Sequence, residues 1–461
     1  MEMKTRKEER DEDENGAERE EGKRKNWMRI GHGLLLMPTA PEGEWERRRR
    51  GGVLSLCWAS DKESYYRGRS VFPGGISTML SNRISSSVLL PVYGDVYPKG
   101  FYYASVHVGQ PPKPYFLDPD TGSDLTWLQC DAPCVRCTDT PHPLYRPSND
   151  LVPCKDPLCI SLQPDDHKCE SPKQCDYEVE YADGGSSYGV LLRDIVPLNF
   201  TNGDRRSPRL AVGCGYDQIP GSSNHYLDGV LGLGKAKASI VSQLHDQGLT
   251  RNVVGHCLSS RGGGYIFFGD SLFDPKQVIW TPMSPDYSKH YAPGPAELIF
   301  GKKSTGVKNL LVVFDSGSSY TYFASQPYHA LISALRRELS GKPLRDAADD
   351  RTLPFCWKGK KPFQSIRDVK KYFMPLALSF INGGKTASRF DLPPEAYLII
   401  SSQGNACLGI LNGTEVGLQE FNVIGDISMQ DKMVVYDNEK HIIGWTPANC
   451  ERLPKGNAVA S

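Results

Sequence analysis

The chain has 461 residues, enough for two to four average domains or one large enzyme, so its length excludes only the smallest folds. Basic and acidic residues balance at 54 each, and no global charge attracts the chain to nucleic acid or to an anionic membrane. The 45 glycines and 34 prolines separate short segments rich in β-branched and aromatic residues, which predicts many short strands and excludes a helical bundle. The apolar runs are far shorter than the roughly 18 residues of a membrane-spanning helix, so we expect no membrane span.

Residues 1–92 are predicted to form an extension outside the folded part of the chain. Residues 1–26 are mostly charged, which predicts disorder, and they lack the apolar core of a signal peptide. The basic run 47–50 fits a nuclear signal, although a run of this length in a flexible segment is more often simply solvated. The extension is either disordered or the result of a wrongly chosen start exon.

The cysteines indicate an oxidising compartment. Twelve of the thirteen lie between Cys130 and Cys450, and eight of these crowd between Cys130 and Cys214. Even numbers of cysteines at this density are typical of disulfide-bonded proteins. We therefore predict six disulfides and a secretory location, extracellular or vacuolar. The N-terminus disagrees with this location, because it lacks the apolar core of a signal peptide. Cys57 stands apart and is expected to be free or removed by processing.

A second interpretation of the cysteines is metal binding. The spacing Cys130-x3-Cys134-x2-Cys137 fits a radical iron–sulfur site, and its last two residues alone could begin a zinc site. No second such pair and no histidine pair completes a zinc tetrad, so we expect no metal and no cofactor. The glycosylation sequons at Asn199 and Asn412 favour the secretory route.

An internal repeat is the most informative feature of the sequence. The segments Asp120–Trp127 (DTGSDLTW) and Asp315–Tyr322 (DSGSSYTY) agree or substitute closely at nearly every position. Each follows apolar residues, at 115–117 and 310–314, that predict a buried strand running into a tight glycine turn. Each aspartate is therefore expected at the end of a strand.

Later in each half comes a second matched element, two apolar residues closed by glycine, at 229–232 and 422–425. Such an element can pack beneath the aspartate turn. A lone Asp-x-Gly is above all a turn sequence, and it is the duplication that favours a function. Two halves that each present one aspartate predict a pseudo-twofold molecule whose carboxylates, Asp120 and Asp315, meet at the junction.

The residue types in the two turns suit a pair of catalytic carboxylates. Gly122 and Gly317 let the backbone approach closely. The hydroxyls of Thr121 and Ser316 can hydrogen-bond to the opposite loop. Two carboxylates about 3 Å apart cannot both ionise cheaply, so they share one proton. One then takes a proton from a water while the other donates to the scissile carbonyl, which predicts peptide hydrolysis with a maximum at acid pH.

From about Tyr97 to Pro454 the chain resembles the pepsin-like aspartic proteases, and more closely their plant nepenthesin-type and nucellin-like branch. The resemblance rests on four segments: Phe116–Cys130, Ala211–Tyr216, Gly229–Gly234 and Phe314–Phe323. It implies an all-β dominated, bilobal pepsin-like fold, with two pseudo-twofold-related β lobes and a central cleft. The lobes would be 93–285, with a Cys-rich insertion and a flap, and 286–461.

The resemblance also implies roles for individual residues. Asp120 and Asp315 would be the catalytic dyad, and Tyr181 would be the flap tyrosine that closes over substrate. Trp127 would offer its indole N–H to that tyrosine. The glycines Gly122 and Gly317 would bind substrate, and the residues that support the dyad would be Thr121, Ser123, Trp127, Ser316 and Ser318. The implied disulfides are Cys356 with Cys407 and Cys257 with Cys450.

One departure from the family leaves a rival function open. Pro119 stands directly before Asp120, where the family usually has a branched apolar residue, and proline offers no N–H to a central strand. We therefore expect Pro119 to weaken stability and dyad alignment, and Pro119→Ile to raise stability and activity. The alternative to an endopeptidase with peptide or protein substrates is a catalytically impaired binding or inhibitor protein, such as the plant inhibitors of cell-wall-degrading enzymes. In either case a monomer is expected.

Overall fold

Most of the described chain is organised in one long sheet and several small ones. The computed structural model describes residues 86–132, 134–163, 173–221, 225–287, 289–382, 385–418 and 421–454. The long sheet has 13 strands in the order β13-β27-β26-β11-β12-β1-β2-β3-β10-β4-β9-β6-β5. These strands are β1 (Val88–Asp95), β2 (Phe101–Val108), β3 (Lys113–Asp120), β4 (Trp127–Gln129), β5 (Asp176–Glu180), β6 (Ser186–Ile195), β9 (Arg209–Ile219), β10 (Gly229–Gly232), β11 (Val253–Leu258), β12 (Gly264–Phe268), β13 (Ile279–Pro282), β26 (Lys432–Asp437) and β27 (Ile442–Pro447).

The small sheets and the helices complete the described chain. One sheet joins β15 (Lys303–Ser304), β14 (Ala296–Phe300), β20 (Leu376–Asn382) and β21 (Lys385–Leu392). Another joins β16 (Val312–Phe314), β25 (Asn422–Ile424), β17 (Thr321–Phe323) and β24 (Ile410–Asn412), and a third joins β18 (Arg345–Asp346), β19 (Cys356–Lys358), β23 (Ala406–Leu408) and β22 (Leu398–Ile400). The last pairs β7 (Leu198–Asn199) with β8 (Arg205–Arg206). The helices are α1 (Pro157–Ile160), α2 (Ile240–Asp246), α3 (Ser325–Leu339), α4 (Ile366–Val369) and α5 (Asp426–Met429).

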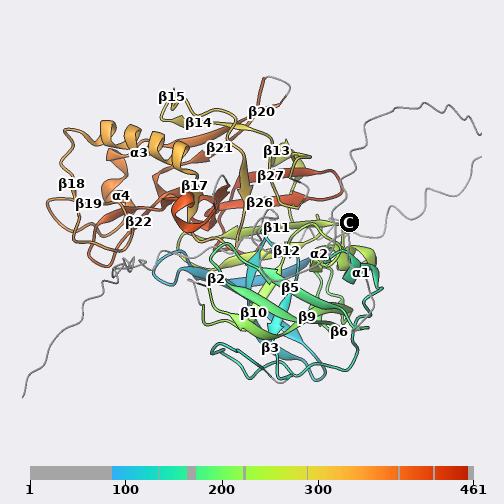
Figure 1. Ribbon diagram of the computed structural model, residues 1–461. Coiled ribbons are helices and arrows are strands. Elements are labelled where there is room, and N and C mark those ends of the chain that lie inside the picture. Colours follow the sequence, from blue (N-terminus) through green and yellow to red (C-terminus); the bar gives the residue numbers. More distant parts are fainter. Residues whose placement is uncertain are drawn as a thin grey trace, which may run out of the picture.

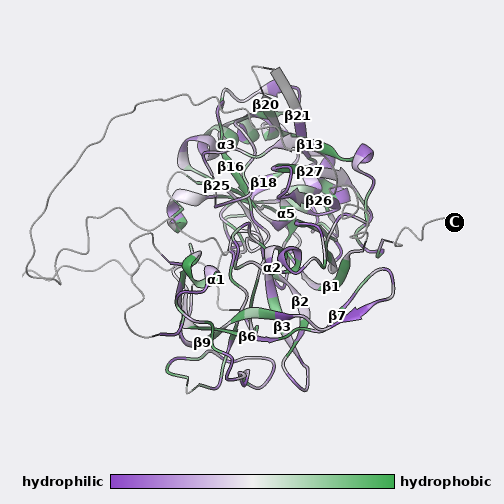
Figure 2. Ribbon diagram, turned by 90° about the vertical axis from the view of Figure 1, so that its right-hand side faces the viewer, coloured by the Kyte–Doolittle hydropathy of each residue, from purple (hydrophilic) through white to green (hydrophobic). Residues whose placement is uncertain are grey.

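The two halves of the chain form two lobes. In Figure 1, β3, β6 and β9 lie in the lower lobe, α3, β14 and β20 lie in the upper lobe, and β11 and β12 run between them. Figure 2, turned by 90°, keeps the same separation, with β3, β6 and β9 below and α3, β16 and β20 above. This arrangement confirms the predicted β-dominated, bilobal fold.

Burial explains why these segments form strands. In β2, buried and more exposed residues alternate, as expected for a strand with one face on the core. Every residue of β11 and of β26 is buried, because each of these strands has a neighbour on both sides in the long sheet and both of its faces are covered. The strand β26 comes from the second half of the chain and pairs with β11 from the first. The long sheet therefore contains strands from both halves of the chain.

The internal repeat is visible in the sheet topology. In the first half, β10 pairs in parallel with β3 and antiparallel with β4, and β4 pairs in parallel with β9. In the second half, β25 pairs in parallel with β16 and antiparallel with β17, and β17 pairs in parallel with β24. The element that follows each aspartate turn therefore packs beside the strand that carries the aspartate, as the matched sequences predict.

Two expectations from the sequence need adjustment. The strand β1 begins at Val88, so residues 88–92 belong to the long sheet and not to the N-terminal extension.

Residues 1–85, including Cys57 and the basic run 47–50, lie outside the described residues. Among the described helices, none combines the length and hydrophobicity needed to cross a bilayer.

The expected cost of Pro119 is also corrected. The backbone N–H of Phe116 faces Asp228, next to β10, and the carbonyl of Asp120 accepts from Leu233 on the same side. Because backbone groups alternate along a strand, the nitrogen and carbonyl of Pro119 point the other way, toward β2. The β2–β3 ladder ends at Leu117, so no ladder hydrogen bond is lost at Pro119.

Disulfides cross-link both lobes. The pairs are Cys130–Cys214, Cys134–Cys137, Cys159–Cys175, Cys257–Cys450 and Cys356–Cys407. The last two confirm the pairs that the family resemblance implied. Cys154 is disulfide-bonded as well, and Cys169 lies outside the described residues. Because all three sulfurs of the 130–137 motif are in disulfides, that motif has no thiolate for an iron–sulfur or zinc site.

Candidate active site

Two aspartates lie at equivalent places in the repeat. Asp120 is the last residue of β3, and Asp315 directly follows β16. Both carboxyl groups are fully buried, and they hydrogen-bond to each other. The structure therefore brings together the two residues that the sequence selected as a dyad.

The loops around the two carboxyl groups make the same contacts. The N–H of Gly122 donates to Asp120 Oδ1 at 2.7 Å, and the Ser123 hydroxyl donates to Asp120 Oδ2. The N–H of Gly317 donates to Asp315 Oδ1 at 3.0 Å, and the Ser318 hydroxyl donates to Asp315 Oδ2 at 2.6 Å. Each carboxyl group is thus held by one backbone N–H and one hydroxyl from its own turn.

Gly122 lies where no side chain fits. A Cβ on Gly122 would stand 2.7 Å from Asp315 Oδ1 and 3.0 Å from Asp120 Oδ1. Any other residue would push the two carboxyl groups apart. The glycine in this turn is required by the close approach of the two loops.

Hydrogen bonds between the loops fix their relative position. The Thr121 hydroxyl donates to the carbonyl of Phe314 at 3.1 Å and accepts from the N–H of Ser316 at 2.9 Å. The Ser316 hydroxyl donates to the carbonyl of Pro119 at 2.7 Å, and the N–H of Thr121 donates to Ser316 Oγ at 3.2 Å. These reciprocal bonds hold the carboxyl groups in register, which is the role predicted for the two hydroxyls.

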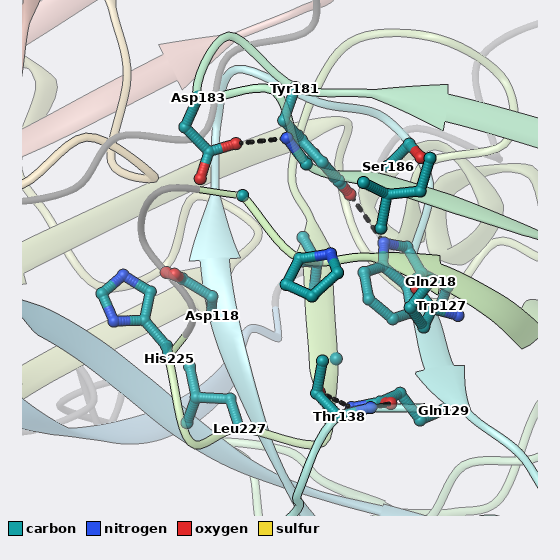
Figure 3. Close-up of a pocket in the computed structure, with 16 residues that line it drawn as sticks. Asp118, Trp127, Gln129, Thr138, Tyr181, Asp183, Ser186, Gln218, His225 and Leu227 are labelled. Atoms are coloured by element: carbon teal, nitrogen blue, oxygen red, sulfur yellow. Dashed lines mark hydrogen bonds between the residues drawn. The ribbon is translucent and has the colours of Figure 1, made fainter. Parts of the chain in front are cut away.

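A hairpin lies near the dyad, and the charge of Asp120 acts on its Tyr181. Strands β5 and β6 are joined by a turn in which Tyr181 donates its N–H to the carbonyl of Gly185, and Gly184 has a φ of 83°. Trp127 Nε1 donates to the hydroxyl of Tyr181 at 2.6 Å. Both aromatic side chains are buried, and Figure 3 shows the Tyr181 hydroxyl pointing toward the Trp127 indole, beside a pocket that both side chains line. The predicted contact between the flap tyrosine and the tryptophan is therefore present.

The electrostatics of the pair are asymmetric. Burial raises the pKa of Asp120 to about 6, although the hydrogen bonds from Ser123, Asp315 and Gly122 oppose this rise. Burial and the charge of Asp120 hold the pKa of Asp315 well above its usual value. Asp120 therefore ionises first while Asp315 keeps its proton. A pair in this state can act on a water molecule as base and acid together.

Sequence reasoning missed three buried groups beside the dyad. Asp118 and Asp426 are buried carboxyls whose pKa values are held well above the usual range by burial and by nearby carboxyl groups, Asp120 among them. His290 forms a hydrogen bond with the backbone of Gly122, and burial lowers the pKa of the His290 ring to about 4. The alternation along β3 places Asp118 on the same face as Asp120, a signal that the sequence contained. No local pattern marks the other two.

Comparison with known proteins shows a consistent family. Residues 102–270 match the protein-family model described as Xylanase inhibitor N-terminal, and residues 297–447 match the one described as Xylanase inhibitor C-terminal. The chain is 45% identical over 389 residues to an aspartic proteinase of Oryza sativa subsp. japonica, covering 81% of this chain and 94% of that protein. It is 26% identical over 400 residues to Aspartic proteinase nepenthesin-2 of Nepenthes gracilis, covering 81% and 82%.

Two solved structures share the fold. Basic 7S globulin from soybean superposes with a TM-score of 0.62 at 16% identity, over 80% of this chain and 99% of that chain. Aspartic proteinase from Irpex lacteus superposes with a TM-score of 0.56 at 17% identity, over 80% and 100%. At these identities the likeness concerns the fold alone.

Proposed function

Because the chain belongs to the pepsin-like aspartic proteinase family of plants, we propose that it is an aspartic endopeptidase with Asp120 and Asp315 as its catalytic dyad. The observation that carries this proposal is the direct hydrogen bond between two buried carboxyl groups that sit in equivalent loops. Peptide or protein is the expected substrate.

The proposed reaction uses a water molecule placed between the two carboxyl groups. Asp120, which ionises first, takes a proton from the water molecule while the water oxygen attacks the carbonyl carbon of the scissile bond. Asp315 gives its proton to the carbonyl oxygen, which forms a neutral tetrahedral intermediate. The intermediate collapses when Asp120 passes its new proton to the nitrogen, Asp315 takes a proton back from a hydroxyl of the intermediate, and the C–N bond breaks. No covalent intermediate and no metal is needed.

Other residues are proposed to position the reactants. Tyr181 would close over the bound peptide, held in place by Trp127, and the backbone at Gly122 and Gly317 would contact the substrate near the dyad. Thr121, Ser123, Ser316 and Ser318 would keep the carboxyl groups aligned through the hydrogen bonds described above. We further propose that the two lobes divide between residues 285 and 286, with the first lobe beginning at β1, and that the protein is a monomer of the secretory pathway.

A binding or inhibitor protein is the second candidate. The observation that favours it is the description of both matching family models, which name xylanase inhibitors. Such a protein would have the same fold and would bind its partner through its surface, so it would need no proton shared between Asp120 and Asp315. The intact loops around the dyad favour the enzyme.

One experiment separates the two functions. The purified protein is incubated with an unfolded protein substrate from acid to neutral pH, with and without a statine-containing inhibitor, and beside an Asp120→Asn variant. Cleavage that the inhibitor and the substitution both abolish supports the endopeptidase. No cleavage at any pH, together with stoichiometric inhibition of a fungal or plant xylanase, would support the second function.

A further inference from the structure

A pocket beside the dyad contains polar groups without partners among the described residues. It has a volume of about 90 Å³ and lies between the flap hairpin and the strands β3, β4 and β10. Figure 3 shows Asp118, Ser186 and Gln218 around this space, with Tyr181 and Trp127 on the same wall. Neither aspartate of the dyad lines it. The pocket is therefore next to the reacting groups and separate from them.

Asp118 is the most unusual of these groups. Its side chain is only 3% exposed, and no hydrogen bond reaches its carboxyl group from the residues that the structure describes. Ser186 Oγ and Gln218 Nε2, which line the same pocket, also have no partner within the described chain. A buried polar atom without a partner costs free energy, and the two acceptors in this pocket, the Asp118 carboxyl group and Ser186 Oγ, favour a ligand that donates hydrogen bonds.

The position of Asp118 says which part of a substrate would reach it. Asp118 and Asp120 are two residues apart on β3, so both side chains point to the same face of the strand. A peptide held with its scissile bond at Asp120 therefore places a neighbouring side chain in the pocket of Asp118. This step rests on the proposed function.

The walls of the pocket suit a long side chain with a charged end. Trp127, Leu227 and Val230 give apolar surface for an aliphatic stem, and Asp183 adds a second carboxyl group. His225 is the basic group that faces this space, and its ring packs 4.5 Å, centroid to centroid, from Phe101. An apolar side chain would leave Asp118 without a donor, and an acidic one would face two carboxyl groups.

We propose that this pocket receives a lysine or arginine side chain next to the scissile bond, with Asp118 as the residue that selects it. The ammonium or guanidinium group donates to the Asp118 carboxylate and to Ser186 Oγ. Burial and the charge of Asp120 raise the pKa of Asp118 when the pocket is empty, and a cation restores its ionised form. A charge-assisted hydrogen bond of this kind is worth about 10- to 100-fold in selectivity.

The test compares paired peptides that differ only in lysine or norleucine, which has the aliphatic stem of lysine without the ammonium. Each residue is placed in turn on either side of the scissile bond, and the readout is the ratio of kcat/KM for the two peptides. Wild type is compared with Asp118→Asn, with Asp118→Leu in case the first variant does not fold. Glu180→Gln is the matched control, because Glu180 is an exposed acid on β5 of the flap that does not line the pocket.

We expect wild type and Glu180→Gln to prefer lysine by about tenfold or more at one position, and both Asp118 variants to lose that preference. A wild-type ratio near or below one, or a ratio unchanged in the Asp118 variants, overturns the pocket assignment and leaves the endopeptidase intact. If neither peptide is cleaved, the endopeptidase fails, and statine peptides with lysine or norleucine are tested for binding by calorimetry. Tighter binding of the lysine form that Asp118→Asn abolishes supports the pocket; equal or absent binding overturns it.

Discussion

The hydroxyl of Thr121 bonds to the backbone of Phe314, 193 residues further along the chain. The same hydroxyl accepts from the N–H of Ser316, so a single side chain satisfies two backbone groups of the opposite lobe. Both partners are buried. This oxygen atom therefore provides two of the hydrogen bonds that fix the relative position of the two carboxyl groups.

We expect Thr121→Val to lower the free energy of unfolding by about 1–3 kcal/mol, because two buried backbone groups lose their partner. Turnover should fall as well, since two of the hydrogen bonds that join the loops are lost. Thr121→Ser restores the hydroxyl and is the matched control. Thermal unfolding and peptide turnover measure both effects; a valine variant that behaves like the serine variant would contradict the role of the oxygen.

Substitution of either aspartate of the dyad should remove catalysis. Asp120→Asn and Asp315→Asn should each lower kcat by at least about a thousandfold, because neither carboxyl group alone can both activate the water and protonate the carbonyl. Asp246→Asn is a suitable control, since that side chain is 63% exposed. Steady-state kinetics on a peptide substrate provide the measurement, and a loss of less than about tenfold in either dyad variant would refute the assignment.

The pH profile should follow the two carboxyl groups. Activity rises as Asp120 ionises, with a limb near its pKa of about 6, and falls at higher pH where Asp315 loses its proton. Because burial raises both pKa values, we expect the maximum to lie above the pH at which a free aspartate ionises. Measurement of kcat/KM across the pH range checks this, and a maximum below about pH 4 would show that the buried carboxyl groups titrate normally.

Stability should fall as pH rises. Burial and the charges of Asp118, Asp315 and Asp120 hold the pKa of Asp426 well above its unfolded value, so the folded state keeps a proton that the unfolded state releases. This contribution is complete below the unfolded pKa near 3.8 and is lost as pH rises toward the folded pKa. Asp426→Asn should therefore flatten the decline in unfolding free energy between acid and neutral pH. Denaturant unfolding at several pH values tests this; identical pH slopes for both proteins would exclude Asp426 as the source.

The two sequons should behave differently. Asn199 is exposed on β7, in the hairpin that projects at the side of the molecule in Figure 2. Asn412 is buried, and its amide nitrogen donates to Glu415 at 2.9 Å. We expect a glycan at Asn199 and none at Asn412 when the protein passes through a secretory pathway. Mass spectrometry of glycopeptides decides this, and a glycan at Asn412 would mean that this loop is modified before it folds.

The dyad loops could be predicted because their signal is local and duplicated. A strand, an Asp-x-Gly turn and a later apolar-apolar-Gly element occur twice, and each part is visible within a few residues. Two of the disulfide pairs followed from the family resemblance, not from spacing. The sequence does not place residues 88–92 in the sheet, because they carry no turn or motif that separates them from what precedes them.

The missed groups depend on tertiary structure. Asp118 looks like an ordinary polar residue in a strand until β10 and the flap bury it. Asp426 begins α5 beside the dyad, and no pattern in the neighbouring sequence indicates another buried acid there. The same holds for Pro119, whose expected penalty depended on a β2 partner that the fold does not place there.

The placement of β26 has a consequence for how the chain matures during synthesis. The strand β11 has its outer edge covered by β26, which begins at Lys432, and Cys257 on β11 bonds to Cys450. Until β26 has left the ribosome, β11 presents an open, apolar edge of the kind that pairs with other chains. A truncation before residue 432 would leave that edge permanently uncovered, so nonsense variants in this region should aggregate instead of yielding a working half.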